Sequence, residues 1–124
     1  MKHYTSIEQS KRLIELGLGF NTADMSYPRE LYLGESEYPV VIAYGFKVDW
    51  TKALPSWSLA ALLELIPSPT LGKVEAKGFN QWYCNTINFI GFGEKNFSYD
   101  GGYHDDPISA CIEVIIWLLE NKYI

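Results

Sequence analysis

Residues 106–121 have the sequence DPISACIEVIIWLLEN, which carries the clearest structural signal in the chain. Asp106 is a typical N-cap residue, and Pro107 suits the first helical position because its φ is already helical. The pattern predicts a helix that ends near Asn121. Its side chains are mostly apolar, and each large one stabilises a fold by roughly 1.5–3 kcal/mol when buried. We therefore expect this helix to be largely buried.

One feature of this helix predicts self-association. Ile116 interrupts the narrow polar stripe, and Trp117 lies about 100° from it around the helix axis. A sheet covers only one side of such a helix, and a second copy of the chain could cover the rest. The sequence predicts a homodimer with Ile116 and Trp117 at or near the interface. Cover by the first helix and residues 19–38 of the same chain is the alternative.

Two shorter helices are expected before it. Thr5 and Glu8 match a capping box, so the first helix should begin at Thr5 and end at Gly17. The second should begin near Ser56, with Leu59, Leu62, Leu63 and Ile66 at helical spacing, and lie on a sheet.

Alternating and β-branched segments predict the strands. The expected strands are residues 31–33, 40–44, 46–50, 74–77, 81–92 and 96–99. We expect the 40–44 strand to be buried, a tight turn at 93–96, and a break in the last strand at 100–102.

Composition fits one globular domain. The chain has 124 residues, 48% hydrophobic and 20% charged, enough for one core without disulfides or metal. We predict a single α+β domain over residues 1–124, with an antiparallel or mixed sheet and about three helices. Cys84 and Cys111 match no metal-ligand spacing and are expected to be free thiols with structural roles.

Charge and hydropathy argue against two classes of partner. The formal net charge is −5 and no basic patch is present, so we expect no nucleic-acid binding. No apolar run approaches the ~20 residues that span a bilayer, and no secretory signal opens the chain. We expect no membrane association and a cytoplasmic location.

The strongest polar cluster is His104, Asp105 and Asp106, just before the last helix. A histidine oriented by a carboxylate can act as acid or base, so a small hydrolase or metal-assisted enzyme is one hypothesis. The interpretation we favour is that these carboxylates cap the helix. No phosphate loop or nucleophile elbow accompanies them, so we expect no cofactor and no bound metal and favour a non-enzymatic role while keeping the enzyme hypothesis open.

Aromatic residues make up 15% of the chain and concentrate in the expected meander. Those singled out are Trp82, Tyr83, Tyr99 and Tyr103. If exposed, they could stack on a nucleoside or sugar or anchor a protein partner, and if buried they belong to the core.

Several segments follow a recognisable family pattern. They are TSIEQSK (5–11), LGL (16–18), TADM (22–25), PSWSL (55–59), LL (62–63), DPI (106–108) and WLLE (117–120). In these segments the chain resembles a family of small uncharacterised proteins from phages, prophages and mobile elements of Bacteroides-type gut bacteria. The resemblance implies a cytoplasmic accessory protein and transfers no catalytic residue.

The hypothesis that we favour from sequence is a non-enzymatic protein-interaction module with an unidentified protein partner. Missing catalytic motifs, acidic charge and the apolar last helix support it. Ligand binding by the aromatic meander and an enzyme at residues 104–106 are the alternatives.

Overall fold

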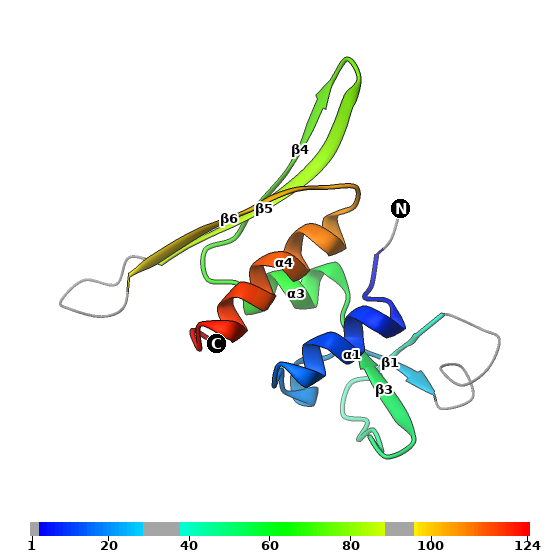
Figure 1. Ribbon diagram of the computed structural model, residues 1–124. Coiled ribbons are helices and arrows are strands. Elements are labelled where there is room, and N and C mark those ends of the chain that lie inside the picture. The colour runs from blue at the N-terminus through cyan, green and yellow to red at the C-terminus, as the bar shows by residue number, and fades with distance from the viewer. Residues whose placement is uncertain (1–2, 29–37, 89–95) are drawn as a thin grey trace.

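The computed structural model describes residues 3–28, 38–88 and 96–124, which form an α+β fold with two three-stranded antiparallel sheets (Figure 1). The described helices are α1 (Ile7–Glu15), the short 3-10 helix η1 (Phe20–Thr22), α3 (Leu59–Leu65) and α4 (Pro107–Glu120). The smaller sheet has the order β2-β1-β3, with strands Val40–Val41, Met25–Pro28 and Ala53–Ser56. The larger has the order β4-β5-β6, with strands Thr70–Ala76, Phe79–Asn88 and Phe97–His104.

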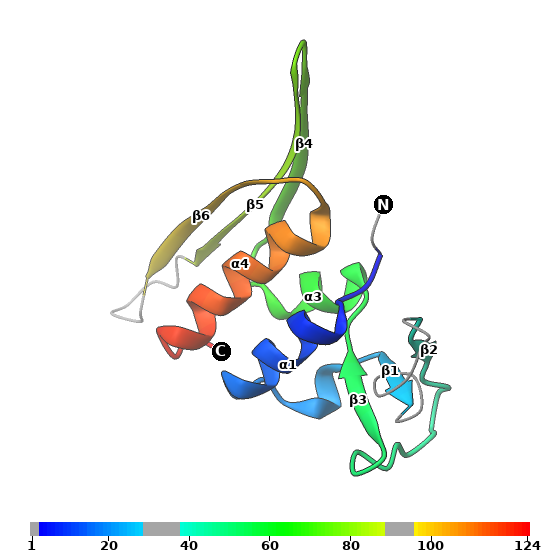
Figure 2. The same cartoon turned by 45° about the vertical axis from the view of Figure 1, so that its right-hand side comes forward.

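Helix α4 begins where the sequence predicts. The Asp106 carboxylate accepts a hydrogen bond from the Ser109 N–H at 2.8 Å, Pro107 occupies the first turn, and Asn121 is the C-cap. Eight of its 14 residues are buried. It packs against β5 and β6 on one side and α3 on the other (Figure 2). The core therefore lies around α4.

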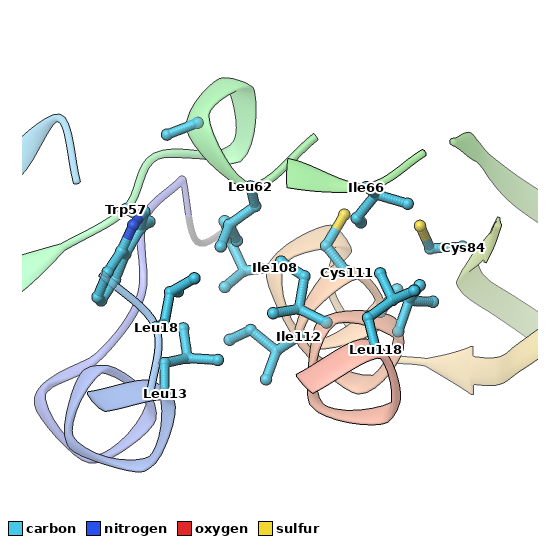
Figure 3. Close-up of a cluster of buried hydrophobic side chains, with 14 of the residues drawn as sticks. Leu13, Leu18, Trp57, Leu62, Ile66, Cys84, Ile108, Cys111, Ile112 and Leu118 are labelled. Atoms are coloured by element: carbon cyan, nitrogen blue, oxygen red, sulfur yellow. The ribbon is translucent and has the colours of Figure 1, made fainter. Parts of the chain in front are cut away.

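Figure 3 shows how the core is assembled. Side chains from α1, α3, α4, β5 and the loops converge, among them Leu13, Leu18, Trp57, Leu62, Ile66, Cys84, Ile108, Cys111, Ile112 and Leu118. Helix α3 contacts α4 rather than lying on a sheet, which corrects the expectation for the second helix.

The larger sheet differs from the expected meander at its last strand. Strand β6 does not break at residues 100–102 but continues to His104. Its register against β5 shifts between Tyr83 and Asn85, and this bulge absorbs the extra residue. Gly101 also fits where a side chain would not, because a Cβ there would lie 3.0 Å from Val114 Cγ2 of α4. The expected 93–96 turn falls mostly outside the described residues.

The N-terminal helix begins one residue later than predicted. Ser6, not Thr5, is the N-cap, and its capping box partner is Gln9. Thr5 is buried, and its hydroxyl is instead bonded to Ser10 and to the Trp57 N–H. The predicted end at Gly17 is confirmed.

The second helix begins two residues later than predicted. Ser58 caps α3, because Ser56 is taken up by β3, where it pairs with Met25. The Asp24 carboxylate accepts hydrogen bonds from both the N–H and the hydroxyl of Ser58. Both shifts arise from long-range pairing that local patterns do not show.

The strand predictions for residues 40–50 are wrong. Only Val40–Val41 forms a strand, and both residues are exposed rather than buried. Residues 46–50 form no strand despite their alternation. The β1 strand has four residues and pairs with β2 only at Met25 and Ser26. The hydrogen-bonded ladder between the two strands is therefore only two residues long. The expected 31–33 strand lies outside the described residues.

Candidate functional site

The sheet β4-β5-β6 has two different faces. Neighbouring residues of a strand point to opposite faces, and cross-strand pairs share one. The inner face carries Cys84, Tyr99 and Gly101 and lies against α4. The outer face comprises Thr70, Gly72, Val74, Ala76, Phe79, Gln81, Tyr83, Asn85, Ile87, Ser98, Asp100 and Tyr103. None of the described helices packs against the outer face (Figures 1 and 2).

The outer face carries an aromatic row formed by Phe79, Tyr103 and Tyr83. The Phe79 and Tyr103 ring centroids are 5.2 Å apart at 85°, and those of Tyr103 and Tyr83 are 6.3 Å apart at 79°. These edge-to-face contacts hold the rings in fixed orientations. Phe79 is 38% exposed and Tyr103 is 56% exposed. Both rings are thus ordered and still accessible.

Gly72 positions the third ring of this row. Its cross-strand partner is Tyr83, whose ring lies directly over the glycine. A Cβ on Gly72 would lie 2.4 Å from the Tyr83 hydroxyl oxygen and 2.7 Å from Cε1. Any side chain there would displace the ring. Neither Gly72 nor Phe79 was singled out from sequence, although the alternation Phe79, Gln81, Tyr83 could have indicated the shared face.

The four aromatics predicted to form one binding surface lie on both faces. Tyr83 and Tyr103 belong to the outer row, whereas Trp82 and Tyr99 lie on the inner face. Lys73 Nζ lies 5.5 Å from the Trp82 ring centroid, in range for a cation–π contact. The structure brings together only two of the four on the accessible side.

The predicted dimer residues on α4 are half-buried by the same chain. Trp117 stacks on Tyr99 with centroids 4.6 Å apart, and it also contacts Phe97 and Tyr123. Ile116 packs against the edge of the core. Phe97 and Tyr123 thus cover part of this helix, which no pattern in the sequence indicated.

A hydrogen bond ties β6 to α4 beside this cluster. The Tyr99 hydroxyl donates to Glu113 Oε1 at 3.0 Å. Burial raises the pKa of Tyr99, and the neighbouring Glu113 carboxylate raises it further.

The three candidate catalytic residues each have a partner within the chain. His104 Nε2 is 2.7 Å from the Gly101 carbonyl oxygen, and Asp105 accepts a hydrogen bond from Gln81. The Asp106 carboxylate accepts from both the N–H and the hydroxyl of Ser109. Within the described ranges, no group of three or more His, Cys, Asp or Glu residues could hold a metal ion. Asp106 therefore caps α4 as expected, whereas Asp105 is bonded to β5 and His104 to β6.

The two cysteines are free and buried between β5 and α4 (Figure 3). Interaction with the neighbouring Cys84 thiol, together with burial, raises the pKa of the Cys111 thiol. They pack as part of the core.

The described surface is hollowed in at least two places. One hollow, of about 340 Å³, lies where β4 begins and includes Ser68, Thr70, Asn85, Ser98, Tyr99 and Asp100. The second, of about 430 Å³, lies on the smaller sheet and is lined largely by apolar residues, among them Val40, Val41 and Phe46. Tyr99 is thus the only predicted ligand-binding aromatic that lines either of these two hollows.

Comparisons of the chain with family models, curated proteins and solved structures gave no match. None of the described helices has the length and apolar character needed to cross a membrane.

Proposed function

We propose that the chain is a non-enzymatic protein-interaction module whose contact surface is the outer face of β4-β5-β6. The observation that carries the proposal is the near absence of charge on an accessible sheet face. Asp100 is the only charged residue among its 12, although a fifth of the chain is charged. The solvated face of an antiparallel sheet is normally polar, whereas interface centres lose charge and gain tyrosine and phenylalanine.

Two further observations support a non-enzymatic role. The side chains of His104, Asp105 and Asp106 are bonded to other groups of the chain, as a cap and its neighbours would be. The buried thiols of Cys84 and Cys111 are enclosed by the core and have no exposed surface.

The proposal includes a cytoplasmic setting as an accessory protein of a phage or other mobile element. The family pattern in the sequence and the two unpaired thiols support that setting, because cytosolic thiols are kept reduced.

Affinity capture with matched variants tests the interaction. Wild type, the double variant Phe79→Ala/Tyr103→Ala and the control Tyr44→Ala would be immobilised and exposed to cytosol of a Bacteroides-type bacterium containing a tagged second copy. Tyr44 is a fully exposed tyrosine outside the outer face. We expect wild type and Tyr44→Ala to retain the same protein and the double variant to lose it. The proposal would be contradicted if wild type retained neither a protein of the cytosol nor the tagged copy. Equal retention by wild type and the double variant would contradict it as well.

A second candidate function is binding of a small neutral ligand at the hollow beside Thr70. Its lining offers hydroxyls of Ser68, Thr70 and Ser98 with the Asn85 amide, and no Lys or Arg. Such a set suits the hydroxyl groups of a sugar or nucleoside. A thermal-shift screen of monosaccharides and nucleosides tests it, because ligand at 100 times its Kd adds ~2.7 kcal/mol of stability. An unchanged Tm throughout would exclude it.

A further inference from the structure

We propose that the partner covering the outer face is a second copy of this chain, with the two sheets packed face to face about a two-fold axis. This inference rests on the proposed function and names its partner. The proposed axis passes near the aromatic row of Phe79, Tyr103 and Tyr83. The sequence predicted a homodimer contact on α4, and this proposal places the contact on the sheet instead.

The charge distribution favours a second copy. In a two-fold interface each group near the axis meets its own symmetry mate, so a charge there would face a like charge. The aromatic row is uncharged, as are Gly72, Val74 and Ala76 on the neighbouring strand. A different partner would normally be selected by complementary charges, and the face offers almost none.

The one carboxylate on the face is already bonded within its own chain. Asp100 Oδ1 accepts a hydrogen bond from the Gly102 N–H at 2.9 Å. The Asn85 amide, turned to donate, lies 3.0 Å from the same oxygen. Asp100 pairs with Asn85, next along β5 from Tyr83 on the same face, so a two-fold axis through the row places the two Asp100 side chains on opposite sides of the axis.

Two other described surfaces of the chain carry charged groups that the outer face lacks. On the inner face, beyond α4, Lys73 and Glu75 form an ion pair at 2.9 Å. On α1, Arg12 and Glu15 are both largely exposed. If two chains packed through either surface about a two-fold axis, charged groups near the axis would face the same groups of the second chain. Only the outer face, among the surfaces compared, is close to neutral throughout.

The size of the face fits a weak dimer interface. Strands β4 and β6 each pair with only part of β5, so the sheet is three strands wide only near the middle of β5. At about 3.3 Å by 4.8 Å per residue, the residues of the three strands offer roughly 400 Å² of flat area per copy. This area is below the roughly 600–1,000 Å² that each partner of a standard interface buries, so we expect a dimer with a micromolar Kd. The entire face must take part, from Phe79 at one end to Ile87 at the other.

The shape of the molecule leaves room for the second sheet. The β4–β5 hairpin extends beyond the rest of the described fold, and α4 lies on the opposite side of the sheet (Figures 1 and 2). Facing sheets pack about 10 Å apart, close enough for the exposed rings of Phe79 and Tyr103 to interdigitate with their copies. Tyrosine suits this position because its ring can be buried while its hydroxyl still reaches a polar group.

Sedimentation velocity on the full-length chain, from about 1 µM to about 200 µM, tests the proposal. The variants are Tyr103→Lys and Phe79→Lys, with Tyr44→Lys as the control for adding a lysine elsewhere and Ile116→Glu as the probe of α4. We expect wild type to be a dimer at the upper concentrations and each outer-face variant to raise the dimer Kd at least about tenfold. We expect Tyr44→Lys and Ile116→Glu, where folded by circular dichroism, to leave the Kd unchanged.

Phe79→Lys keeps the test decisive if Tyr103→Lys fails to fold, because Phe79 lies at the start of β5, outside the buried core. A wild type that stays monomeric overturns the proposal, as does a dimer that a folded Phe79→Lys leaves intact. Dissociation by a folded Ile116→Glu alone would place the interface on α4. A monomer that still captures a different protein through the outer face overturns this inference and leaves the proposed function standing. A monomer that captures nothing contradicts both.

Discussion

The inner and outer faces of β4-β5-β6 share the same strands and yet have opposite environments. On the inner face, Gly101 lets α4 approach closely, and Tyr99 stacks on Trp117. On the outer face, Phe79 and Tyr103 form an equally ordered contact but keep much of their surface accessible. A solvated sheet face normally carries several charges, so the composition of the outer face supports the proposed contact role.

Truncating a core side chain beneath the inner face should destabilise the fold most. Leu118 of α4 is fully buried in the core, and Leu118→Ala should lower the free energy of unfolding by about 2–5 kcal/mol through lost burial and a residual cavity. Urea denaturation of wild type and variant measures the change. The matched control, Ser98→Ala on the outer face, should change stability by less than about 0.5 kcal/mol. Similar losses in both would remove the distinction between the faces.

A smaller effect is expected at the contact between β6 and α4. In Gly101→Val the new Cβ would lie 3.0 Å from Val114 Cγ2 and 3.1 Å from the Cys84 carbonyl oxygen, so β6 and α4 must separate. We expect a loss of about 1–3 kcal/mol. Ser98→Val, on the same strand and the opposite face, is the control and should be nearly neutral. Thermal unfolding with an unchanged Tm for Gly101→Val would mean that α4 does not lie against this strand.

The smallest expected effect concerns one hydrogen bond. Tyr99→Phe removes the bond from the Tyr99 hydroxyl to Glu113 and should lower stability by about 0.5–1.5 kcal/mol. Because the pKa of Tyr99 is raised in the fold, its contribution is fully present below the unfolded value of about 10 and declines as the pH rises above it. The stability difference between wild type and Tyr99→Phe should therefore shrink in alkaline solution.

Unfolding measured at neutral pH and at high pH checks the hydrogen-bond prediction. Tyr103→Phe on the outer face serves as the control, and its difference from wild type should stay small at both pH values in the monomer. A Tyr99→Phe variant as stable as wild type at neutral pH would show that this bond adds nothing to the packing of α4.

The parts of the fold that were predictable depend on local signals. Asp106 and Pro107 mark the start of α4 by chemistry that acts within one turn, and Gly17 ends α1 for a similar reason. The shifted starts of α1 and α3 were not predictable, because Thr5 and Ser56 are bonded to residues far away in the chain. The alternation of apolar and polar residues over 46–50 indicated a strand. A strand also needs a neighbouring strand to pair with, and the alternation does not show whether one is present.

The candidate site was predictable only in part. Tyr83 and Tyr103 were singled out for their residue type, but their shared face depends on cross-strand register and on the bulge between Tyr83 and Asn85. The same register assigns Trp82 to the opposite face. One residue of slip would exchange the faces, so no count of aromatics could have separated the core from the contact surface.

Hydroxyl-radical footprinting at two protein concentrations tests whether two copies of the chain meet through the outer face. The full-length chain would be labelled at about 1 µM and about 200 µM, below and above the Kd of a micromolar dimer. We predict that Phe79 and Tyr103 are oxidised at the lower concentration and protected at the higher one. Tyr44 should be oxidised at both and Leu118 at neither. Equal oxidation of Phe79 and Tyr103 at the two concentrations, with Tyr44 unchanged, would contradict the account of the outer face as the surface where two copies meet.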